Sequence, residues 1–307
     1  MPGDHSVTKL HGLDVAFRQE LEGGGRGFGQ DFIPLVEHMF GRVGRLFELC
    51  AGPGWVGFSL LAKGLCDHLV LGDVNPRAIE VLHETVRMNG LEDRVTIYET
   101  DVLDGIPADE RWDLVVVNPP HFSEPIGKNS TLVLTDPEWQ LHRSVYGSVA
   151  DFLNPGGSVL MLENTEGSRP DEFIPMIADG GLSHMRTMWY SGSEALPIFY
   201  FMWAQKALPG MTFDDEPVAL DVPLRETPGE PVVAPAGRPC AVQLENETGR
   251  PVGPRVLDGS GNSQLWVRLD KLPAGAKMQL PVMALKPGEY EVRDRIEDVT
   301  VGRLVAQ

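Results

Sequence analysis

The residues that could do chemistry begin with three glycines, Gly52, Gly54 and Gly57, in G-x-G-x-x-G spacing directly after the apolar run Leu46–Leu49. Glycines in this arrangement permit positive φ angles and let the backbone approach a ligand closely. Asp73 follows the next apolar run, about twenty residues further on, where an acid suits hydrogen bonds to a ribose diol. The glycine spacing alone also fits dinucleotide-binding proteins, so the residues that follow must decide between them.

Two further polar stretches follow two further predicted strands. Asp101 comes after Val95–Glu99, and the tetrad Asn118–His121 (Asn-Pro-Pro-His) comes after Trp112–Val117. Helices are predicted between the strands, one of them with Asn75–Pro76 as its cap and first-turn proline. This alternation predicts an α/β fold with a mainly parallel, doubly wound sheet. The functional residues would then gather at the carboxyl edge of its strands.

Taken in this order, the glycine turn, the ribose acid, the second acid and the Asn-Pro-Pro tetrad resemble the class I S-adenosylmethionine-dependent methyltransferases. The most similar subgroup has an Asn-Pro-Pro-aromatic signature and includes N6-adenine and release-factor glutamine methyltransferases. The resemblance covers approximately residues 28–206. It implies a Rossmann-like domain, S-adenosylmethionine as cofactor and an enzyme that methylates nitrogen.

The resemblance also implies which residues hold the cofactor. Glu48 would help to bind its methionine end, Asp73 its ribose, and Asp101 its adenine amino group. Glu48 could instead be a buried acid satisfied by backbone groups, and Asp101 could cap the turn that follows it. The full cofactor set predicted on this basis is Glu48, Gly52, Gly54, Gly57, Asp73, Asp101, Val102 and Asn118.

The catalytic residues implied by the resemblance are Asn118, Pro119 and His121. In the subgroup, the asparagine side-chain oxygen and a neighbouring backbone carbonyl accept hydrogen bonds from the acceptor NH group and orient its lone pair. His121 stands where the subgroup has a stacking aromatic residue. Histidine can stack, but it can also accept a proton near neutral pH. The tetrad could otherwise be a rigid turn after a strand.

Five more residues are candidate substrate contacts: Phe28, Gln30, Phe122, His142 and Arg143. The first two lie in a glycine-rich stretch that could be the hinge of a mobile lid. Phe122 opens a predicted substrate loop over residues 122–134. His142 and Arg143 follow that loop, where Arg143 could pair with a substrate carboxylate or belong to a solvated helix face.

The chain divides by composition into four predicted parts. Residues 1–45 form an N-terminal helical cap or lid, with a helix over 12–22 whose apolar residues recur every four positions. Residues 46–207 form the S-adenosylmethionine-binding domain, and residues 208–238 form a linker. Residues 239–307 form an all-β domain, immunoglobulin-like or a barrel. Its predicted strands are Cys240–Leu244, Leu265–Leu269, Met278–Met283, Glu289–Arg293 and Val299–Val305.

Composition bounds the partners and the compartment. The net charge is −18, of which residues 1–207 contribute −14. Because a nucleic-acid enzyme normally carries a basic footprint, nucleic acid is disfavoured as a partner. No apolar run is long enough to span a bilayer, no signal peptide is recognisable, and three scattered cysteines give neither disulfides nor a metal motif. These features predict a cytoplasmic protein with no metal.

We therefore expect an S-adenosylmethionine-dependent N-methyltransferase acting on an amine, amide or ring nitrogen of a small molecule or peptide. A first alternative is a protein or RNA (adenine) N-methyltransferase whose β domain docks the macromolecule. A second is a non-catalytic interaction protein built on a methyltransferase scaffold. The β domain is also a candidate contact for a homodimer.

Overall fold

A computed structural model of the chain describes residues 5–21, 23–124, 134–188, 199–207, 217–259, 263–265, 271–280, 283–285, 287–294 and 296–307. The chain forms two compact units. The first consists of Met1–Ile33 with Arg42–Lys206, and the second of Pro34–Gly41 with Ala207–Gln307. The second unit therefore takes in most of helix α1 (Phe32–Met39) as well as the C-terminal third of the chain.

The first unit is built on a seven-stranded sheet with the order β5-β4-β3-β6-β7-β9-β8. The five strands from β5 to β7 pair in parallel, whereas β9 is antiparallel to both of its neighbours. The expected doubly wound, Rossmann-like sheet is thus present, as a mixed sheet. Its strands are β3 (Val43–Leu49), β4 (Cys66–Asp73), β5 (Val95–Glu99), β6 (Trp112–Val117), β7 (Leu153–Asn164), β8 (Leu182–Met188) and β9 (Phe199–Lys206).

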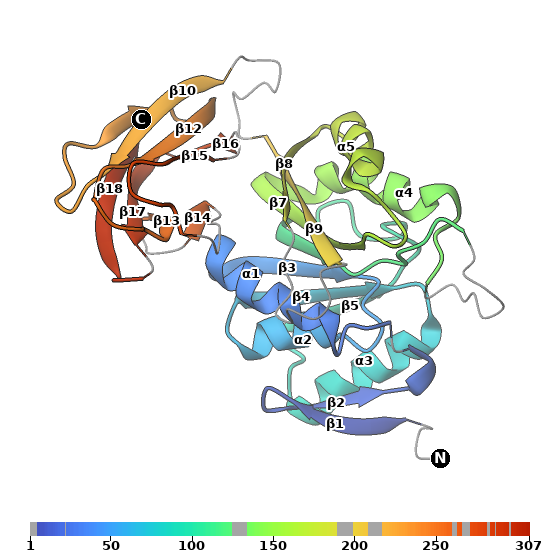
Figure 1. Cartoon of the computed structure of the whole chain (residues 1–307). Coiled ribbons are helices and arrows are strands. Elements are labelled where there is room, and N and C mark those ends of the chain that lie inside the picture. The colour runs from blue at the N-terminus through green and yellow to red at the C-terminus, as the bar shows by residue number, and fades with distance from the viewer. Residues whose placement is uncertain are drawn as a thin grey trace. The chain divides into compact units, whose positions relative to one another are not determined.

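Helices cover both faces of this sheet (Figure 1). Helices α2 (Trp55–Ala62) and α3 (Pro76–Asn89) lie on one face, and α4 (Gln140–Ser148) and α5 (Pro170–Asp179) lie on the other. Because side chains alternate along a strand, β3 sends Phe47 and Leu49 into the core beneath α4 and α5. The residue between them, Glu48, points to α2 instead, where Gly57 donates a hydrogen bond to it.

The N-terminal residues differ from the prediction. Strands β1 (Ser6–Leu10) and β2 (Leu13–Phe17) form an antiparallel hairpin, so the helix expected over 12–22 is wrong. Tertiary contacts decide the outcome here. The backbone of β2 is held to α3 by a hydrogen bond from Ala16 N to Thr85 Oγ1 of 3.0 Å, and Val15 and Ala16 are fully buried.

The second unit is rich in strands, which form two sheets. Residues 208–238, predicted as a linker, contain two strands, β10 (Val218–Leu224) and β11 (Val232–Ala234), which pair in parallel with β12 and β18. The immunoglobulin-like or barrel form stays a prediction, and most of the strand expected at Leu265–Leu269 lies outside the described residues. The remaining strands are β12 (Pro239–Asn246), β13 (Pro254–Asp258), β14 (Ser263–Leu265), β15 (Lys277–Gln279), β16 (Met283–Ala284), β17 (Gly288–Asp294) and β18 (Val299–Ala306).

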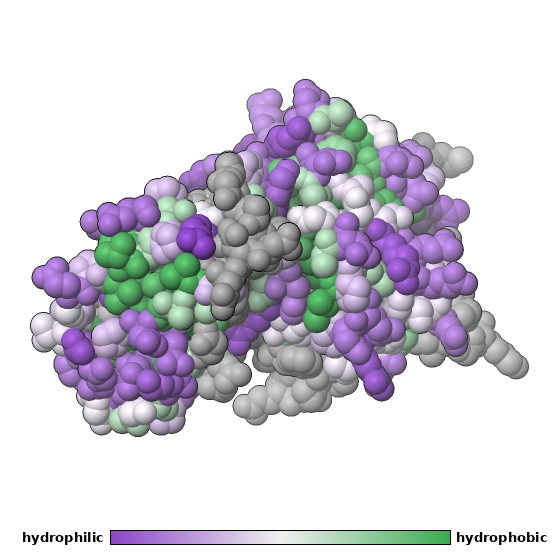
Figure 2. Space-filling view, turned by 90° about the horizontal axis from the view of Figure 1, so that it is seen from above, coloured by the Kyte–Doolittle hydropathy of each residue, from purple (hydrophilic) through white to green (hydrophobic). Residues whose placement is uncertain are grey.

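Hydrophilic residues cover much of the surface seen in Figure 2, with hydrophobic residues gathered in smaller areas between them. This agrees with a chain in which charged residues make up 23% of the sequence. Among the described residues, no helix has the length and apolar character needed to cross a membrane.

Candidate active site

A cavity of about 410 Å³ opens at the carboxyl ends of β3, β4, β5 and β6. The strand order reverses between β3 and β6, which is where open α/β sheets bind their ligands. The volume falls within the range of about 300–1,000 Å³ that is usual for ligand sites. Six of the predicted cofactor residues line the cavity: Glu48, Gly52, Asp73, Asp101, Val102 and Asn118.

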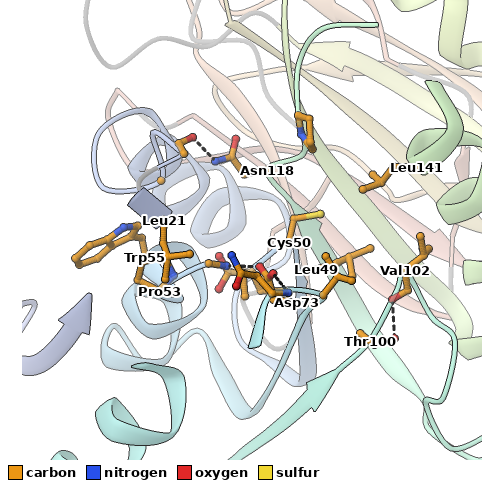
Figure 3. Close-up of a pocket in the computed structure, with 18 of the residues that line it drawn as sticks. Leu21, Leu49, Cys50, Pro53, Trp55, Asp73, Thr100, Val102, Asn118 and Leu141 are labelled. Carbon is orange, nitrogen blue, oxygen red and sulfur yellow. Dashed lines mark hydrogen bonds between the residues drawn. The ribbon is translucent and has the colours of Figure 1, made fainter. Parts of the chain in front are cut away.

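Figure 3 shows how the walls of the cavity are arranged. Leu21, Pro53 and Trp55 lie on one side in this view, with Val102 and Leu141 on the other. Asn118 and Asp73 lie between these walls, Asn118 above and Asp73 below. The lining is therefore mostly apolar, with a few polar groups placed from different strand ends, as in sites that hold a small ligand.

The predicted glycine turn connects β3 to α2. Gly52 and Gly54 have φ angles of 52° and 79°, in the region that favours glycine. Gly57 is needed for a different reason, because a Cβ atom there would lie 2.6 Å from Glu48 Oε2. Its backbone N–H donates a 2.7 Å hydrogen bond to that same oxygen. Gly54 and Gly57 therefore shape the turn without lining the cavity themselves.

Two acids border this turn, Glu48, which is buried, and Asp73, which is partly buried. Burial raises the pKa of Glu48 to about 8, although hydrogen bonds from the N–H groups of Gly57 and Val56 oppose the change. Asp73 accepts hydrogen bonds from Gly52 N at 2.7 Å and Asn75 N at 2.9 Å. Burial raises the pKa of Asp73 too, and these backbone hydrogen bonds act against that rise. The acid thus ties the glycine turn to the end of β4.

The wall after β5 is formed by residues 100–102. Thr100 Oγ1 donates to the carbonyl oxygens of Val102 and Asp104, at 3.2 and 2.7 Å, and Val102 has a φ of 55°. These contacts fix a tight turn. Asp101, at its start, is exposed and lines the cavity.

Asn118 follows β6 and carries an unsatisfied polar atom. Its Nδ2 donates a 3.3 Å hydrogen bond to the carbonyl of Gly23, which is drawn as a dashed line in Figure 3. Its Oδ1 is buried and has no hydrogen-bond partner among the described residues. An acceptor in this condition costs about 1–3 kcal/mol. The side chain therefore presents an acceptor to which a donor could bind.

The glycine-rich stretch before α1 is held by Gln30. Its Nε2 donates to the carbonyls of Gly25 and Trp55, at 3.1 and 3.4 Å, and its Oε1 accepts from Ser59 Oγ at 3.1 Å. Leu21, Gly23 and Gly25 of this segment line the cavity, whereas Gln30 and Phe28 do not.

The aromatic residues beside Asn118 form a separate group. The ring centroids of Phe28 and Phe199 lie 4.4 Å apart, and those of His121 and Phe199 lie 6.0 Å apart. Pro120 lines the cavity, and the buried His121 follows it directly. Phe122 is held by a bridge to Thr135, and residues 125–133 of the predicted substrate loop lie outside the described residues.

The last two predicted substrate residues lie away from the cavity. His142 is fully buried, with Nδ1 2.6 Å from Asp136 Oδ2 and Nε2 2.9 Å from Glu163 Oε1. Arg143 is exposed, and its Nε donates to the carbonyl of Glu138 at 3.3 Å. His142 is thus part of a buried ionic network.

Burial opposes the charge on His142, but the two carboxylates beside it raise its pKa to about 9. Burial also disfavours the charges on Asp136 and Glu163, yet their contacts with His142 leave the pKa of each carboxyl below its usual value. The network therefore holds an imidazolium between two carboxylates. No group of residues that could hold a metal occurs in the part of the chain that the structure describes.

Sequence reasoning missed Glu163 and the cavity wall at Leu21, Gly23 and Gly25. Glu163 lies near the end of an apolar strand, β7, which is the same signal that pointed to Asp73. The glycine run was recognised as a lid hinge, but its contact with Asn118 joins residues 95 positions apart and has no local signal.

The sequence model of the methyltransferase small domain family matches residues 33–170 of the chain. This part of the chain is similar to that family. The matched region of the methyltransferase domain contains β3 to β6, the glycine turn and the Asn118–His121 tetrad. The match confirms the resemblance drawn from the motifs and, with it, the expectation of S-adenosylmethionine as cofactor.

Curated relatives are similar to a part of this chain. The release factor glutamine methyltransferase of Leptospira interrogans is 26% identical over 118 residues, covering 37% of this chain and 41% of that protein. The ribosomal protein uL3 glutamine methyltransferase of Neisseria gonorrhoeae is 29% identical over 129 residues, covering 39% and 42%. The chain thus spans about two fifths of the length of these relatives.

A solved structure described as a tRNA methyltransferase from Streptococcus pneumoniae has 11% identity and a TM-score of 0.44, covering 59% of this chain and 72% of that one. These comparisons correct one expectation. A small-molecule or peptide partner, with nucleic acid disfavoured, is wrong, because the curated relatives are named for macromolecules: a release factor and a ribosomal protein. The acidic composition misled because total charge says little about one docking surface.

Proposed function

We propose that this chain is an S-adenosylmethionine-dependent N-methyltransferase whose acceptor is a protein side-chain nitrogen, with the glutamine amide as first choice. The observation that carries the proposal is the buried Asn118 Oδ1, which has no hydrogen-bond partner among the described residues and lies at the cavity. An amide N–H is a donor that would satisfy it. The curated relatives support the choice, since both are named as glutamine methyltransferases.

The residues present fit the cofactor. The cavity has a size suited to one bound small molecule, and Glu48, Asp73, Asp101 and Val102 all line it. We assign Glu48 to the methionine end, Asp73 to the ribose hydroxyls and Asp101 to the adenine amino group. Bound there, S-adenosylmethionine supplies an electrophilic methyl group on a sulfonium.

The work left to the protein is mainly positioning. Asn118 Oδ1 would accept a hydrogen bond from one acceptor N–H, and the Pro119 carbonyl would accept another. With both protons held, the nitrogen is fixed in place and aimed at the methyl carbon. The hydrogen bond from Asn118 Nδ2 to Gly23 keeps the amide group from turning over, so that its oxygen faces the acceptor.

The second unit contributes no residue to the cavity. We propose that its strands hold the macromolecule that carries the acceptor nitrogen. This assignment leaves the chemistry to the first unit.

The experiment has two arms that separate cofactor from acceptor. Calorimetry with S-adenosylhomocysteine should show binding by the wild type and a loss of at least tenfold in affinity for Asp73→Ala. Transfer of a labelled methyl group should then be measured to purified release factor and ribosomal protein uL3, with free glutamine as the small-molecule comparison. Mass spectrometry of the labelled protein should place the methyl group on a glutamine.

Asn118→Ala should bind S-adenosylhomocysteine normally and lose at least 100-fold in transfer rate. Methylation of free glutamine as fast as that of the release factor or ribosomal protein uL3 would count against a protein acceptor. Absence of S-adenosylhomocysteine binding by the wild type would overturn the proposal altogether.

A further inference from the structure

Methylation of an amide or amine nitrogen releases a proton, and this proton needs an acceptor. On the proposed function, the new N–C bond forms as the bond between the methyl carbon and sulfur breaks, with its electron pair left on sulfur. One N–H bond then breaks, and its electrons stay on nitrogen. Asn118 Oδ1 and the Pro119 carbonyl hold the acceptor, but an amide or peptide oxygen is too weak a base to keep the proton.

Two unpartnered polar atoms face each other beside this position. His121 Nδ1 lies 4.0 Å from Glu163 Oε2. Each atom is buried, and neither has a hydrogen-bond partner among the described residues. The His121 side chain is only 10% exposed and Glu163 is 0% exposed. Such a pair is unexplained if His121 only stacks on a substrate, since a stacking ring needs no carboxylate behind it.

Glu163 is fixed in position by the rest of the network. Its other oxygen, Oε1, lies 2.9 Å from His142 Nε2, and His142 Nδ1 lies 2.6 Å from Asp136 Oδ2. Burial opposes ionisation of Glu163, but the charge of His142 lowers the pKa of this carboxyl below its usual value. A fixed, ionised carboxylate with one free oxygen is therefore directed at His121.

The other groups that face Glu163 do not take this role. Tyr146, on α4, has a buried hydroxyl without a partner among the described residues, and burial raises its pKa well above the usual value. Tyr200, on β9, has its hydroxyl 2.8 Å from Ser168 Oγ. The His121 ring also contacts the ring of Phe199, which is apolar. His121 is thus the group through which this carboxylate can act on the acceptor.

We propose that His121 accepts the proton released by the acceptor nitrogen on its Nε2, while Glu163 accepts a hydrogen bond from its Nδ1–H. The inference rests on the proposed function. In this arrangement Glu163 is a positioning residue: it holds the imidazole in the tautomer with a free Nε2 and stabilises the imidazolium that forms. Atoms and charge balance, because a neutral amide, a sulfonium and a neutral imidazole become an N-methyl amide, a thioether and an imidazolium. His121 then returns its proton to water.

The kinetic test measures the methyl-transfer rate of each variant on the acceptor protein identified by the experiment above. His121→Phe keeps a ring for stacking and removes the base, so we expect the transfer rate to fall about 100- to 1,000-fold. S-adenosylhomocysteine affinity should stay within twofold of the wild type. The methyl-transfer rate of the wild type should rise with pH as one group loses its proton, and this pH dependence should be absent in His121→Phe. A rate within threefold of the wild type in His121→Phe would overturn the proposal.

Glu163→Gln tests the positioning role. Without the anion the imidazolium that forms is less stable, so the transfer rate should fall about tenfold while S-adenosylhomocysteine affinity stays within twofold of the wild type. Tyr146→Phe is the matched control, since it alters a buried polar group beside Glu163 and should leave the transfer rate within twofold of the wild type. An unchanged transfer rate in Glu163→Gln would contradict the assignment.

A last measurement does not depend on an acceptor or on a folded variant. Nitrogen-15 NMR of the wild type with S-adenosylhomocysteine should show neutral His121 protonated on Nδ1. The opposite tautomer, with the proton on Nε2, would overturn the proposal even where methyl transfer succeeds. If the expected tautomer is found but no protein is methylated, the result contradicts the acceptor assigned under the proposed function. It still supports the hydrogen bond from His121 Nδ1–H to Glu163.

Discussion

At the scale of single residues, two polar groups in the mostly apolar cavity are held at a cost in free energy. Asn118 Oδ1 has no partner among the described residues, and Glu48 is 3% exposed with a pKa of about 8. A ligand that donates a hydrogen bond to Asn118 Oδ1 or places a positive charge beside Glu48 would offset that cost. A site of this kind is expected to bind its ligand with measurable changes in protonation.

Glu48 gives the first prediction. With a pKa of about 8 it is mostly protonated at pH 7. A cationic amino group at the methionine end of the cofactor would lower this pKa, so that binding releases close to one proton. Calorimetry with S-adenosylhomocysteine at pH 7 in two buffers of different ionisation enthalpy measures this release. Glu48→Gln should show no release and about tenfold weaker binding, whereas equal heats in both buffers for the wild type would contradict the assignment.

At the scale of elements, the turn between β3 and α2 depends on the packing of Gly57. A Cβ atom there would lie 2.6 Å from Glu48 Oε2 and 2.8 Å from Leu69 Cδ1. Gly57→Ala should therefore destabilise the protein by about 1–3 kcal/mol and weaken cofactor binding. Gly147→Ala is the matched control, because this exposed glycine of α4 has no atom within 4 Å of a Cβ. Denaturant titrations should show the control unchanged or stabilised by up to about 1 kcal/mol. Equal stability of the two variants would contradict this account of the turn.

The elements also show how far a sequence can be interpreted. Strands β5 and β6 agree with their predicted bounds, because each is a short run rich in β-branched and aromatic residues. The helix predicted over 12–22 is wrong at β2 because Leu13 and Phe17 are four residues apart, a spacing that also suits a helix. Its pairing with β1 and its contacts with α3 distinguish the two, and the hydrogen bond from Ala16 N to Thr85 Oγ1 joins residues 69 positions apart.

The network that joins α4 to β7 gives a prediction on stability. The folded-state pKa of His142 is about 9, above the value of about 6.5 in an unfolded chain. The folded state therefore holds this proton more tightly, and the stabilisation is complete below pH 6.5 and lost as pH rises through 9. Denaturant titrations of the wild type at pH 6, 7.5 and 9 should show a loss to which His142 contributes roughly 3 kcal/mol at most.

His142→Gln serves as the control for this loss. Glu48 also ionises in part of this range, and its raised pKa adds to the decline between about pH 4.5 and 8. The difference between wild type and His142→Gln isolates the histidine. A difference that does not change between pH 6 and 9 would show that His142 is not charged in the folded protein.

At the scale of the whole molecule, the sheet and the cofactor edge follow from local patterns, whereas the buried network does not. Asp136, His142 and Glu163 come from three separate elements, and their contact depends on how α4 packs on β7. Of these three residues, the sequence singles out only His142, as a candidate substrate contact. The sequence therefore predicts the residues that line the cavity more completely than it predicts the buried network of Asp136, His142 and Glu163.

The division into two units gives the last prediction. Each unit has its own sheets, and all residues that line the cavity belong to the first. Differential scanning calorimetry should therefore show two thermal transitions, of which only one responds to S-adenosylhomocysteine. At 100 times the dissociation constant the ligand stabilises the unit that binds it by about 2.7 kcal/mol, which corresponds to a shift of about 5–10 °C for a domain of this size. Asp73→Ala should remove the shift and leave the second transition unchanged. A single transition, or two that move together, would show that the units unfold as one and that cofactor binding is felt throughout the chain.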